Sequence, residues 1–199
     1  RRKAQANWLA QNPPEIWQQT DKFLLLSGYL TYRLTGQFKD SVGSIVAYLP
    51  YDYKKQRWAA RSDWKWHALP VKESMLSQLV KPGEPLGEIT PEASKFTGIT
   101  AGTKLIASAS DKACEVLGSG CISPETASLS YGTTATINTN NARYVEPQPF
   151  IPPYTSAIPE QYNSEVMIYR GFWMVNWFKQ EFGQREMHRA KELGVTPES

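Results

Sequence analysis

Apolar residues along the chain fall into short runs that proline, glycine and polar residues separate. Residues 13–19 predict a short helix, because proline is tolerated in a first helical turn. Residues 23–26 form an apolar run of strand length. Apolar residues at helical spacing over 29–34 predict a helix that Gly36 ends. The first part of the chain is therefore expected to be mainly helical.

The middle of the chain mixes loop and helix signals. Residues 37–60 are rich in aromatic and turn-forming residues, so we expect a loop there. The apolar positions of residues 68–80 share one helical face and predict a helix. Thr90 and Pro91 suit the cap and the first residue of another helix, which we expect to end at Gly98.

Strand and helix signals alternate in the second half. Residues 103–107 predict a buried strand, and a short helix over 111–117 follows it. Residues 126–131 and 135–139 then alternate like two strands of a hairpin. This order predicts the α/β class.

The remaining residues predict one irregular region, one strand and one helix. Residues 140–164 hold five prolines and are expected to be irregular. Residues 166–169 are a strand candidate, and the apolar residues after Gly171 predict an amphipathic helix. Its two tryptophans, Trp173 and Trp177, are expected in the core because they lie four residues apart.

The chain length indicates one to two domains. Its 199 residues lie between one and two times the usual domain size of roughly 150 residues. The glycine-rich segment 118–120 is the best boundary, so we expect one domain in residues 1–120 and the start of another in 121–199. The chain opens without methionine on a helix-like stretch, which predicts the middle portion of a longer protein.

Composition excludes several classes of protein. A net charge of +3 is too small to indicate a polyanionic partner. No apolar run approaches the roughly 18 residues of a membrane helix, and residues 1–3 have no apolar segment of a signal peptide behind them. Two cysteines cannot form a disulfide framework, so we expect buried thiols in a reducing, cytoplasmic setting.

Asp111 is the sharpest candidate for chemistry. It follows the strand predicted over 103–107 and begins the next helix, which puts its carboxylate where ligands bind in α/β sheets. A carboxylate there can act as a general base toward an alcohol. The alternative is that Asp111 only caps its helix.

The hairpin turn Gly132-Thr133-Thr134 is the second candidate. Glycine lets the backbone approach a ligand, and threonine hydroxyls with backbone N–H groups can hold phosphate oxygens. The alternative is an ordinary glycine turn. Together with Asp111, the turn suggests phosphoryl transfer, in which positioning and electrostatics do most of the catalysis.

Five collinear segments resemble motifs of the FGGY carbohydrate kinases, a family that includes xylulokinase, glycerol kinase and gluconate kinase. They are residues 22–36, 40–44, 86–103, 109–113 and 128–134. The first resembles the family's K-x-L-L-x-x-D-Y-L-x-Y-R-L-T-G and the last its S-L/Y-G-T-S/T. The shared order makes the resemblance specific, although no single motif would.

The resemblance implies an actin/hexokinase-like (ribonuclease H-like) sugar kinase with two α/β domains around a cleft. It implies that Asp111 takes the proton from a sugar or polyol hydroxyl that attacks the γ-phosphate of ATP. Gly132, Thr133 and Thr134 match the hairpin that meets the ATP phosphates with Mg²⁺. Gly171 falls in the family's next nucleotide-side segment. A homodimer is a further expectation, and no protein metal ligand is assigned.

Departures from the family pattern bear on the substrate and on activity. Lys112 follows the candidate base where the family often has Asn or Gln, and it suggests an acidic or phosphorylated sugar, or a lysine that lowers the pKa of Asp111. Ser110 replaces a glycine, and Ser27 replaces an aspartate. The family's D-x-G-T and G-G-G-A segments do not occur. We therefore expect these 199 residues alone to be inactive.

Two other classes of function stay open. Residues 53–67 interleave basic and aromatic residues, as in a single-strand nucleic-acid platform, although we expect a solvated loop with packed tryptophans there. The chain could also be a sugar- or nucleotide-binding module without catalysis. His67 and His188 lie beside no cluster of ligands, so we expect no metal site at either.

Overall fold

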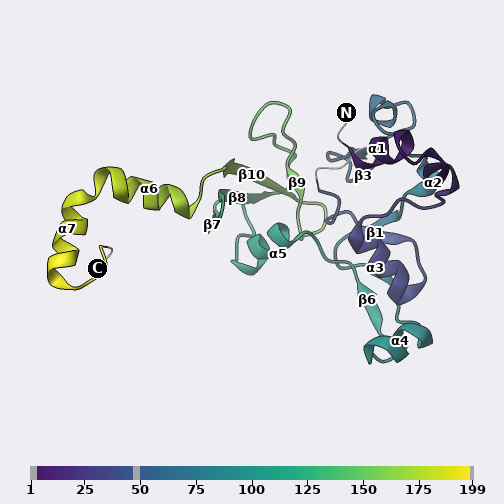
Figure 1. The fold of residues 1–199 in the computed structure, drawn as a ribbon. Helices are drawn as coiled ribbons and strands as arrows, with labels where there is room; N and C mark the ends of the chain where they lie inside the picture. Colours follow the sequence, from purple (N-terminus) through teal and green to yellow (C-terminus); the bar gives the residue numbers. More distant parts are fainter. Residues whose placement is uncertain (1–3, 47–49, 198–199) are drawn as a thin grey trace.

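The computed structural model describes residues 4–46 and 50–197. The helix-like start over residues 1–3 lies outside the described residues, as do residues 198–199. Figure 1 shows helices and short strands of the first half gathered on one side, a sheet in the middle, and two helices that extend away from it. The mixture of helices and strands confirms the predicted α/β class.

Three helices open the chain: α1 (Gln5–Gln11), α2 (Pro14–Gln19) and α3 (Leu26–Thr35). Proline in the first turn of α2 and left-handed Gly36 after α3 confirm the predicted helix start and helix end. The strand predicted over residues 23–26 is wrong, because α3 already begins at Leu26 and the residues before it pair with no strand.

A parallel pair of strands forms the first small sheet. Strand β1 (Lys39–Ser41) pairs with β4 (Gln78–Val80), so the loop expected over 37–60 contains a strand. The helix predicted over 68–80 is wrong, and only a 3₁₀ turn over Glu73–Met75 and β4 form there. Tertiary pairing with β1 outweighed the helical spacing of the apolar residues.

A second two-stranded sheet pairs β5 (Pro85–Glu88) with β6 (Lys104–Ile106) around α4 (Pro91–Thr97). Thr90 caps α4, since its hydroxyl accepts a hydrogen bond from the amide of Ala93, and left-handed Gly98 ends the helix, both as predicted. Strand β6 also confirms its prediction, but its two end residues are exposed rather than buried.

A four-stranded sheet, in the order β7-β8-β10-β9, forms the middle of the molecule (Figure 1). Its antiparallel strands are β7 (Ser128–Tyr131), β8 (Ala135–Asn141), β9 (Tyr154–Thr155) and β10 (Tyr162–Ile168). The predicted hairpin is confirmed, whereas the region expected to be irregular contributes β9 and the start of β10. Helix α5 (Asp111–Gly118) precedes this sheet and contacts β8.

The first half packs against the sheet through the hairpin of β2 (Tyr51–Asp52) and β3 (Arg57–Trp58). The fully buried ring of Tyr51 joins Val42 and Ile45 in a small core. Its hydroxyl lies 3.1 Å from that of Thr155 in β9. This buried contact fixes the β2–β3 hairpin to one edge of the sheet.

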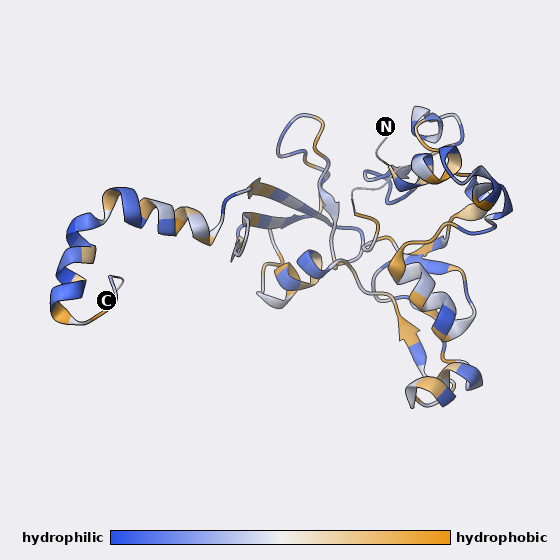
Figure 2. Cartoon of the chain, in the orientation of Figure 1, coloured by the Kyte–Doolittle hydropathy of each residue, from blue (hydrophilic) through white to orange (hydrophobic). Residues whose placement is uncertain are grey.

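Helices α6 (Phe172–Phe182) and α7 (Gln184–Leu193) extend away from the body as an arm (Figure 1). Both helices are amphipathic, and apolar residues alternate with polar ones along the arm in Figure 2. The core position expected for Trp173 and Trp177 is wrong, because the two side chains are 47% and 46% exposed. Helix α6 buries none of its residues against the rest of the described structure.

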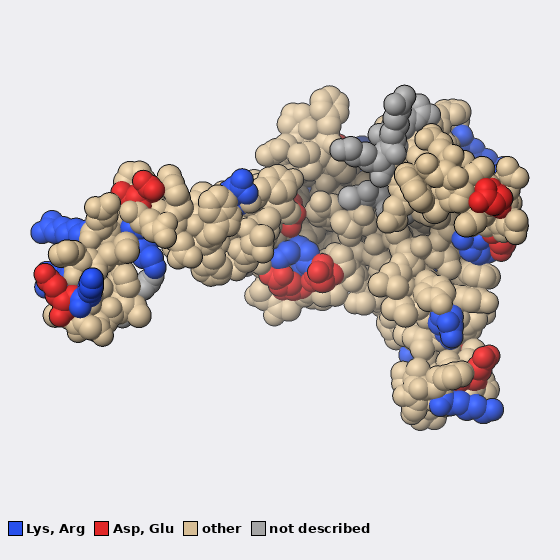
Figure 3. Space-filling view, in the orientation of Figure 1, with Lys and Arg blue, Asp and Glu red and all other residues tan. Residues whose placement is uncertain are grey.

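On the face drawn in Figure 3, the described residues form no dominant patch of one sign of charge. Within the described ranges, no helix is long and apolar enough to cross a membrane. On the face drawn in Figure 3, Lys and Arg lie in small groups, mostly close to Asp or Glu. Ion pairs among the described residues include Arg61 with Glu73 at 2.6 Å.

Candidate functional site

The loop after β6 places Asp111 at the first residue of α5. The N-cap is Ser110, whose hydroxyl accepts a hydrogen bond from the amide of Ala113 at 3.3 Å. The alternative that Asp111 caps this helix is therefore wrong by one residue. Its position still favours a negative charge, since the N-terminal end of a helix carries partial positive charge.

The carboxylate of Asp111 is exposed at the start of α5. Its Oδ1 atom accepts a hydrogen bond from the backbone amide of Lys112 at 2.7 Å. That bond lies within the first turn, so it leaves the second carboxylate oxygen open toward solvent. An exposed carboxylate at the end of a strand can reach a hydroxyl of a bound ligand.

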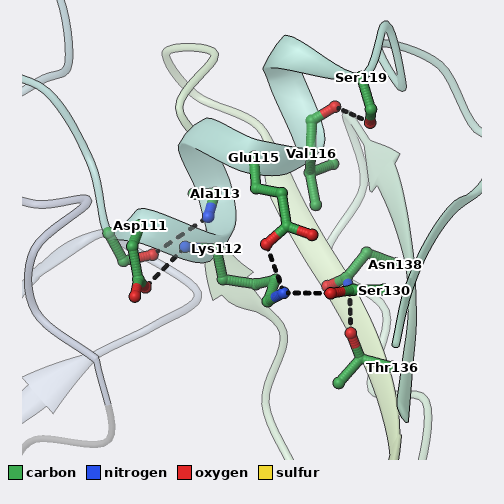
Figure 4. A network of polar contacts seen from close by, with 10 residues as sticks. Asp111, Lys112, Ala113, Glu115, Val116, Ser119, Ser130, Thr136 and Asn138 are labelled. Carbon is green, nitrogen blue, oxygen red and sulfur yellow. Dashed lines mark hydrogen bonds and ion pairs between the residues drawn. The ribbon is translucent and has the colours of Figure 1, made fainter. Parts of the chain in front are cut away.

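Lys112 points away from Asp111 and into a polar network between α5 and β7 (Figure 4). Its ammonium lies 2.6 Å from Oε2 of Glu115 and 3.1 Å from the hydroxyl of Ser130. The hydrogen bond from Lys112, helped by Ser130, lowers the pKa of Glu115 below its usual value. The alternative, in which the ammonium of Lys112 forms an ion pair with the carboxylate of Asp111, does not occur, because the ammonium pairs with Glu115 instead.

The candidate phosphate turn closes the hairpin of β7 and β8, with Tyr131 opposite Ala135. The amide of Gly132 donates to the carbonyl of Thr134 at 2.8 Å, which makes the turn tight. Within the described part of the chain, the hydroxyls of Thr133 and Thr134 donate to no protein partner. Threonine hydroxyls at a turn containing glycine fit the oxygens of a phosphate.

Gly171 lies directly against this turn, although it follows Thr134 by 37 positions in the sequence. Its amide donates to the carbonyl of Thr133 at 2.9 Å, and the next amide, of Phe172, donates to the carbonyl of Gly132 at 3.0 Å. A Cβ atom at Gly171 would lie 1.9 Å from the carbonyl oxygen of Gly132. Only glycine allows this approach, so the structure brings together two segments singled out from the sequence.

The two parts of the candidate site are joined through one side chain. Lys112, next to Asp111, contacts Ser130, which lies two residues before Gly132. Helix α5 and the phosphate turn are therefore connected across the proposed domain boundary. Among residues 4–46 and 50–197, no group of three or more His, Cys, Asp or Glu side chains could hold a metal ion.

In the basic and aromatic block of residues 53–67, two of the three tryptophans are hydrogen-bonded to the protein backbone. The indoles of Trp58 and Trp66 are half-buried and donate to the carbonyls of Ser77 and Ala59. Trp64 is exposed at the start of a 3₁₀ turn over Trp64–His67. A nucleic-acid platform would need a row of exposed aromatic rings, and of these three tryptophans only Trp64 is exposed.

Sequence reasoning missed two features of the site. Glu115 follows Lys112 by three residues, and that helical spacing alone predicts an ion pair. Ser41 and Gly43 contact the loop before Asp111, but no short-range signal indicates it because the chain positions are far apart. Cys114 and Cys121 are free thiols, and only Cys121 is fully buried as expected.

Comparison with known proteins finds similarity to sugar kinases over most of the chain. Residues 4–118 match the domain family described as "FGGY family of carbohydrate kinases, N-terminal domain". The uncharacterized sugar kinase YgcE of Escherichia coli K12 is 35% identical over 176 residues, which are 86% of this chain and 35% of that protein. The xylulose kinase of Lactococcus lactis is 26% identical over 182 residues, covering 89% of this chain and 35% of that enzyme.

Solved structures show where the fold belongs. The ligand-bound xylulose kinase from Lactobacillus acidophilus superposes with a TM-score of 0.74 at 23% identity, over 96% of this chain and 36% of that one. This likeness confirms the predicted actin/hexokinase-like α/β fold. The chain spans about a third of the length of the curated relatives it matches.

Proposed function

The chain belongs to the FGGY family of carbohydrate kinases, and we propose that its protein transfers the γ-phosphoryl group of ATP to a hydroxyl of a sugar, polyol or sugar acid. The family and the sugar-kinase relatives support the reaction class. The observation that carries the assignment of residues is that α5, which begins with the exposed Asp111, contacts the hairpin of the turn Gly132–Thr134 through Lys112 and Ser130.

Asp111 is the proposed general base. Its exposed carboxylate accepts the proton from the acceptor hydroxyl as the hydroxyl oxygen bonds to the γ-phosphorus and the bond to the β-phosphate oxygen breaks. The products are ADP and the sugar phosphate. General-base catalysis typically contributes about 10²- to 10⁴-fold to a rate, which sets the size of effect that Asp111 should have.

The turn Gly132-Thr133-Thr134 is proposed to hold the phosphates of ATP. Its free threonine hydroxyls can donate to phosphate oxygens. The amides of Gly171, in the proposed nucleotide-side segment, and of the next residue hold the turn by donating to its carbonyl oxygens. Mg²⁺, when bound with ATP, neutralises charge on the phosphates. The described residues contain no cluster of metal ligands, so we assign no Mg²⁺ ligand to this part of the protein.

Lys112 is the proposed contact for an acidic substrate. Its ammonium is half-buried between Glu115 and Ser130 at the start of the helix that carries Asp111. A substrate carboxylate or phosphate would replace Glu115 as its partner. Lys112→Met should then raise KM for D-gluconate about tenfold and leave KM for glycerol unchanged, since a charged hydrogen bond is lost only with the acid. Equal changes for both acceptors would contradict this role.

A boundary near residue 120 is part of the proposal, with one domain in 1–120 and a second beginning in 121–199. The family match ends at residue 118, and the strands after residue 120 pair only with one another in the described structure. A homodimer stays a prediction. The two free thiols support the proposed reducing, cytoplasmic setting.

The test is ADP release by the full-length protein with D-xylulose, D-gluconate, glycerol and other ketoses, polyols and sugar acids as acceptors. We expect acceptor-dependent turnover that falls at least about hundredfold in Asp111→Asn. Glu92→Gln is the matched control, because Glu92 is also an acidic residue in a first helical turn. Full activity of Asp111→Asn would exclude the base role and leave a binding module.

The 199-residue chain alone is proposed to have no measurable turnover. The support is that it spans about a third of its relatives' length and has neither the D-x-G-T nor the G-G-G-A segment of the family. The same assay on this chain alone should give no acceptor-dependent ADP release. Clear activity would contradict this expectation without affecting the assignment of Asp111.

A further inference from the structure

The loop that carries Asp111 is attached to the residues that follow strand β1. The hydroxyl of Ser41 donates a hydrogen bond to the carbonyl oxygen of Ser108. The amide of Ser110 donates to the carbonyl of Gly43 at 2.8 Å, and Gly43 forms a parallel β-bridge with Ala109. Each residue of the loop from 108 to 110 therefore has a direct backbone contact with residues 41–43.

Gly43 makes this attachment close. A Cβ atom on Gly43 would lie 2.6 Å from Cβ and 2.8 Å from Cα of Ala109. The second distance is to backbone, so an added methyl group cannot be accommodated by a side-chain rotation. Any larger residue at position 43 must push the loop away and move the start of α5.

Residues 41–43 are themselves held in place by buried groups. Ser41 is 2% exposed, and its hydroxyl also accepts a hydrogen bond from the amide of Gly43 at 3.1 Å. The buried carboxylate of Asp40 accepts from the amide of Ser41 at 2.8 Å and from the hydroxyl of Ser27 in α3 at 2.7 Å. A series of buried contacts thus runs from α3 through β1 to the loop before Asp111.

Asp111 depends on this loop for its position. Its side chain is exposed, and among the described residues its carboxylate accepts one hydrogen bond, from the amide of the next residue. No other described side chain orients the carboxylate, so its place is set by the backbone from 108 to 110. A displacement of a reacting group by about 1 Å can lower a rate about hundredfold.

We infer that Ser41 and Gly43 are positioning residues that fix the Asp111 carboxylate for proton transfer, an inference that rests on the proposed function. They contact no reacting atom themselves. Their contribution is to hold the backbone on which the base is mounted.

Hydrogen exchange of the full-length protein tests the attachment without any substrate. Ser41→Ala and Gly43→Ala should raise exchange of the amides in 108–114 about tenfold and leave α4 (Pro91–Thr97) unchanged, because the lost contacts are local. Ser156→Ala is the matched control. Ser156 is equally buried, and its hydroxyl also donates one hydrogen bond and accepts one from a backbone amide.

Kinetics with the acceptor that gives the fastest ADP release test the consequence for Asp111. Ser41→Ala should lower kcat about tenfold at constant KM, and it should slow the Asp111→Asn protein no further, because its effect passes through that carboxylate. Gly118→Ala, at a glycine with open space around it, should keep the activity of the unaltered protein.

Three results would overturn the inference. They are unchanged exchange in 108–114, a fall in kcat that adds fully to that of Asp111→Asn, and global unfolding of Ser41→Ala while Ser156→Ala stays folded. Full activity of Asp111→Asn would instead overturn the proposed function, and the exchange result would still decide whether residues 41–43 hold the loop.

Discussion

The two loops of the candidate site are held in different ways. The loop before Asp111 is held by two hydrogen bonds and a backbone bridge to Ser41 and Gly43, which are both buried at the end of β1 and just after it. The turn Gly132–Thr134 closes a hairpin and receives support from one point outside it, at Gly171 and the amide after it. A base needs a fixed position, whereas a phosphate turn needs free donors, and the two kinds of support correspond to these needs.

The largest effect is expected where the turn has its single support. Gly171→Ala would place a Cβ atom 1.9 Å from the carbonyl oxygen of Gly132, so the turn or the start of α6 must move. We expect kcat/KM for ATP to fall about hundredfold, with KM for the acceptor unchanged. Steady-state kinetics of the full-length protein measure both.

Gly118→Ala again provides the comparison for this change, since a Cβ atom there meets nothing within 4 Å. Similar kcat/KM for ATP in the two variants would mean that Gly171 does not support the phosphate turn. A raised KM for the acceptor in Gly171→Ala would show that the substitution also disturbs the acceptor site and not the phosphate turn alone.

A smaller effect is expected at the cap of α5. Ser110→Ala removes the hydroxyl that accepts from the amide of Ala113 and should cost about 1 kcal/mol in the free energy of unfolding. Ser110→Gly should cost only a few tenths, because glycine is tolerated at an N-cap. Denaturant titration measures both, and an unchanged free energy of unfolding in Ser110→Ala would show that the hydroxyl contributes no stability.

The smallest effect is expected at the connection between the two loops. Lys112 lowers the pKa of Glu115, so the folded state gains stability above the usual glutamate pKa and loses it as the pH falls through the lowered value. Lys112→Met should raise the pKa of Glu115 toward its usual value. The cost at neutral pH should stay below about 1 kcal/mol, because this pair is partly exposed to solvent.

An NMR titration of the Glu115 carboxyl group follows this change directly. Ser130→Ala should raise the same pKa by less, since Lys112 is the larger cause. An unchanged pKa of Glu115 in Lys112→Met would show that the ion pair between Lys112 and Glu115 within α5 does not persist in solution.

Local signals in the sequence predicted local structure well. The proline start of α2, the Thr90 cap and Gly98 end of α4, and the hairpin of β7 and β8 each depend on residues within one turn of one another. The helix expected over 68–80 failed because its last residues pair with β1, which lies far away in the sequence. The strand expected over 23–26 failed because α3 already begins at Leu26 and the residues before it pair with no strand.

The candidate site divides in the same way. Asp111 and the turn Gly132–Thr134 were found from residue type and from the predicted elements beside them. Ser41 and Gly43 were not, because their contacts with the loop depend on tertiary packing rather than on spacing. The exposed face of α6 was also missed, since amphipathic spacing predicts a helix but not what covers it.

The bond between Ser41 and Ser108 joins positions 67 residues apart and has a consequence for how the site forms. Closing so long a loop costs chain entropy before any contact compensates for it, and contacts of this kind slow folding. Helix α5 can begin to form from its own sequence, but the loop in front of it cannot take its final path until β1 is in place. Asp111 should therefore reach its working position late, together with the first half of the chain as a whole.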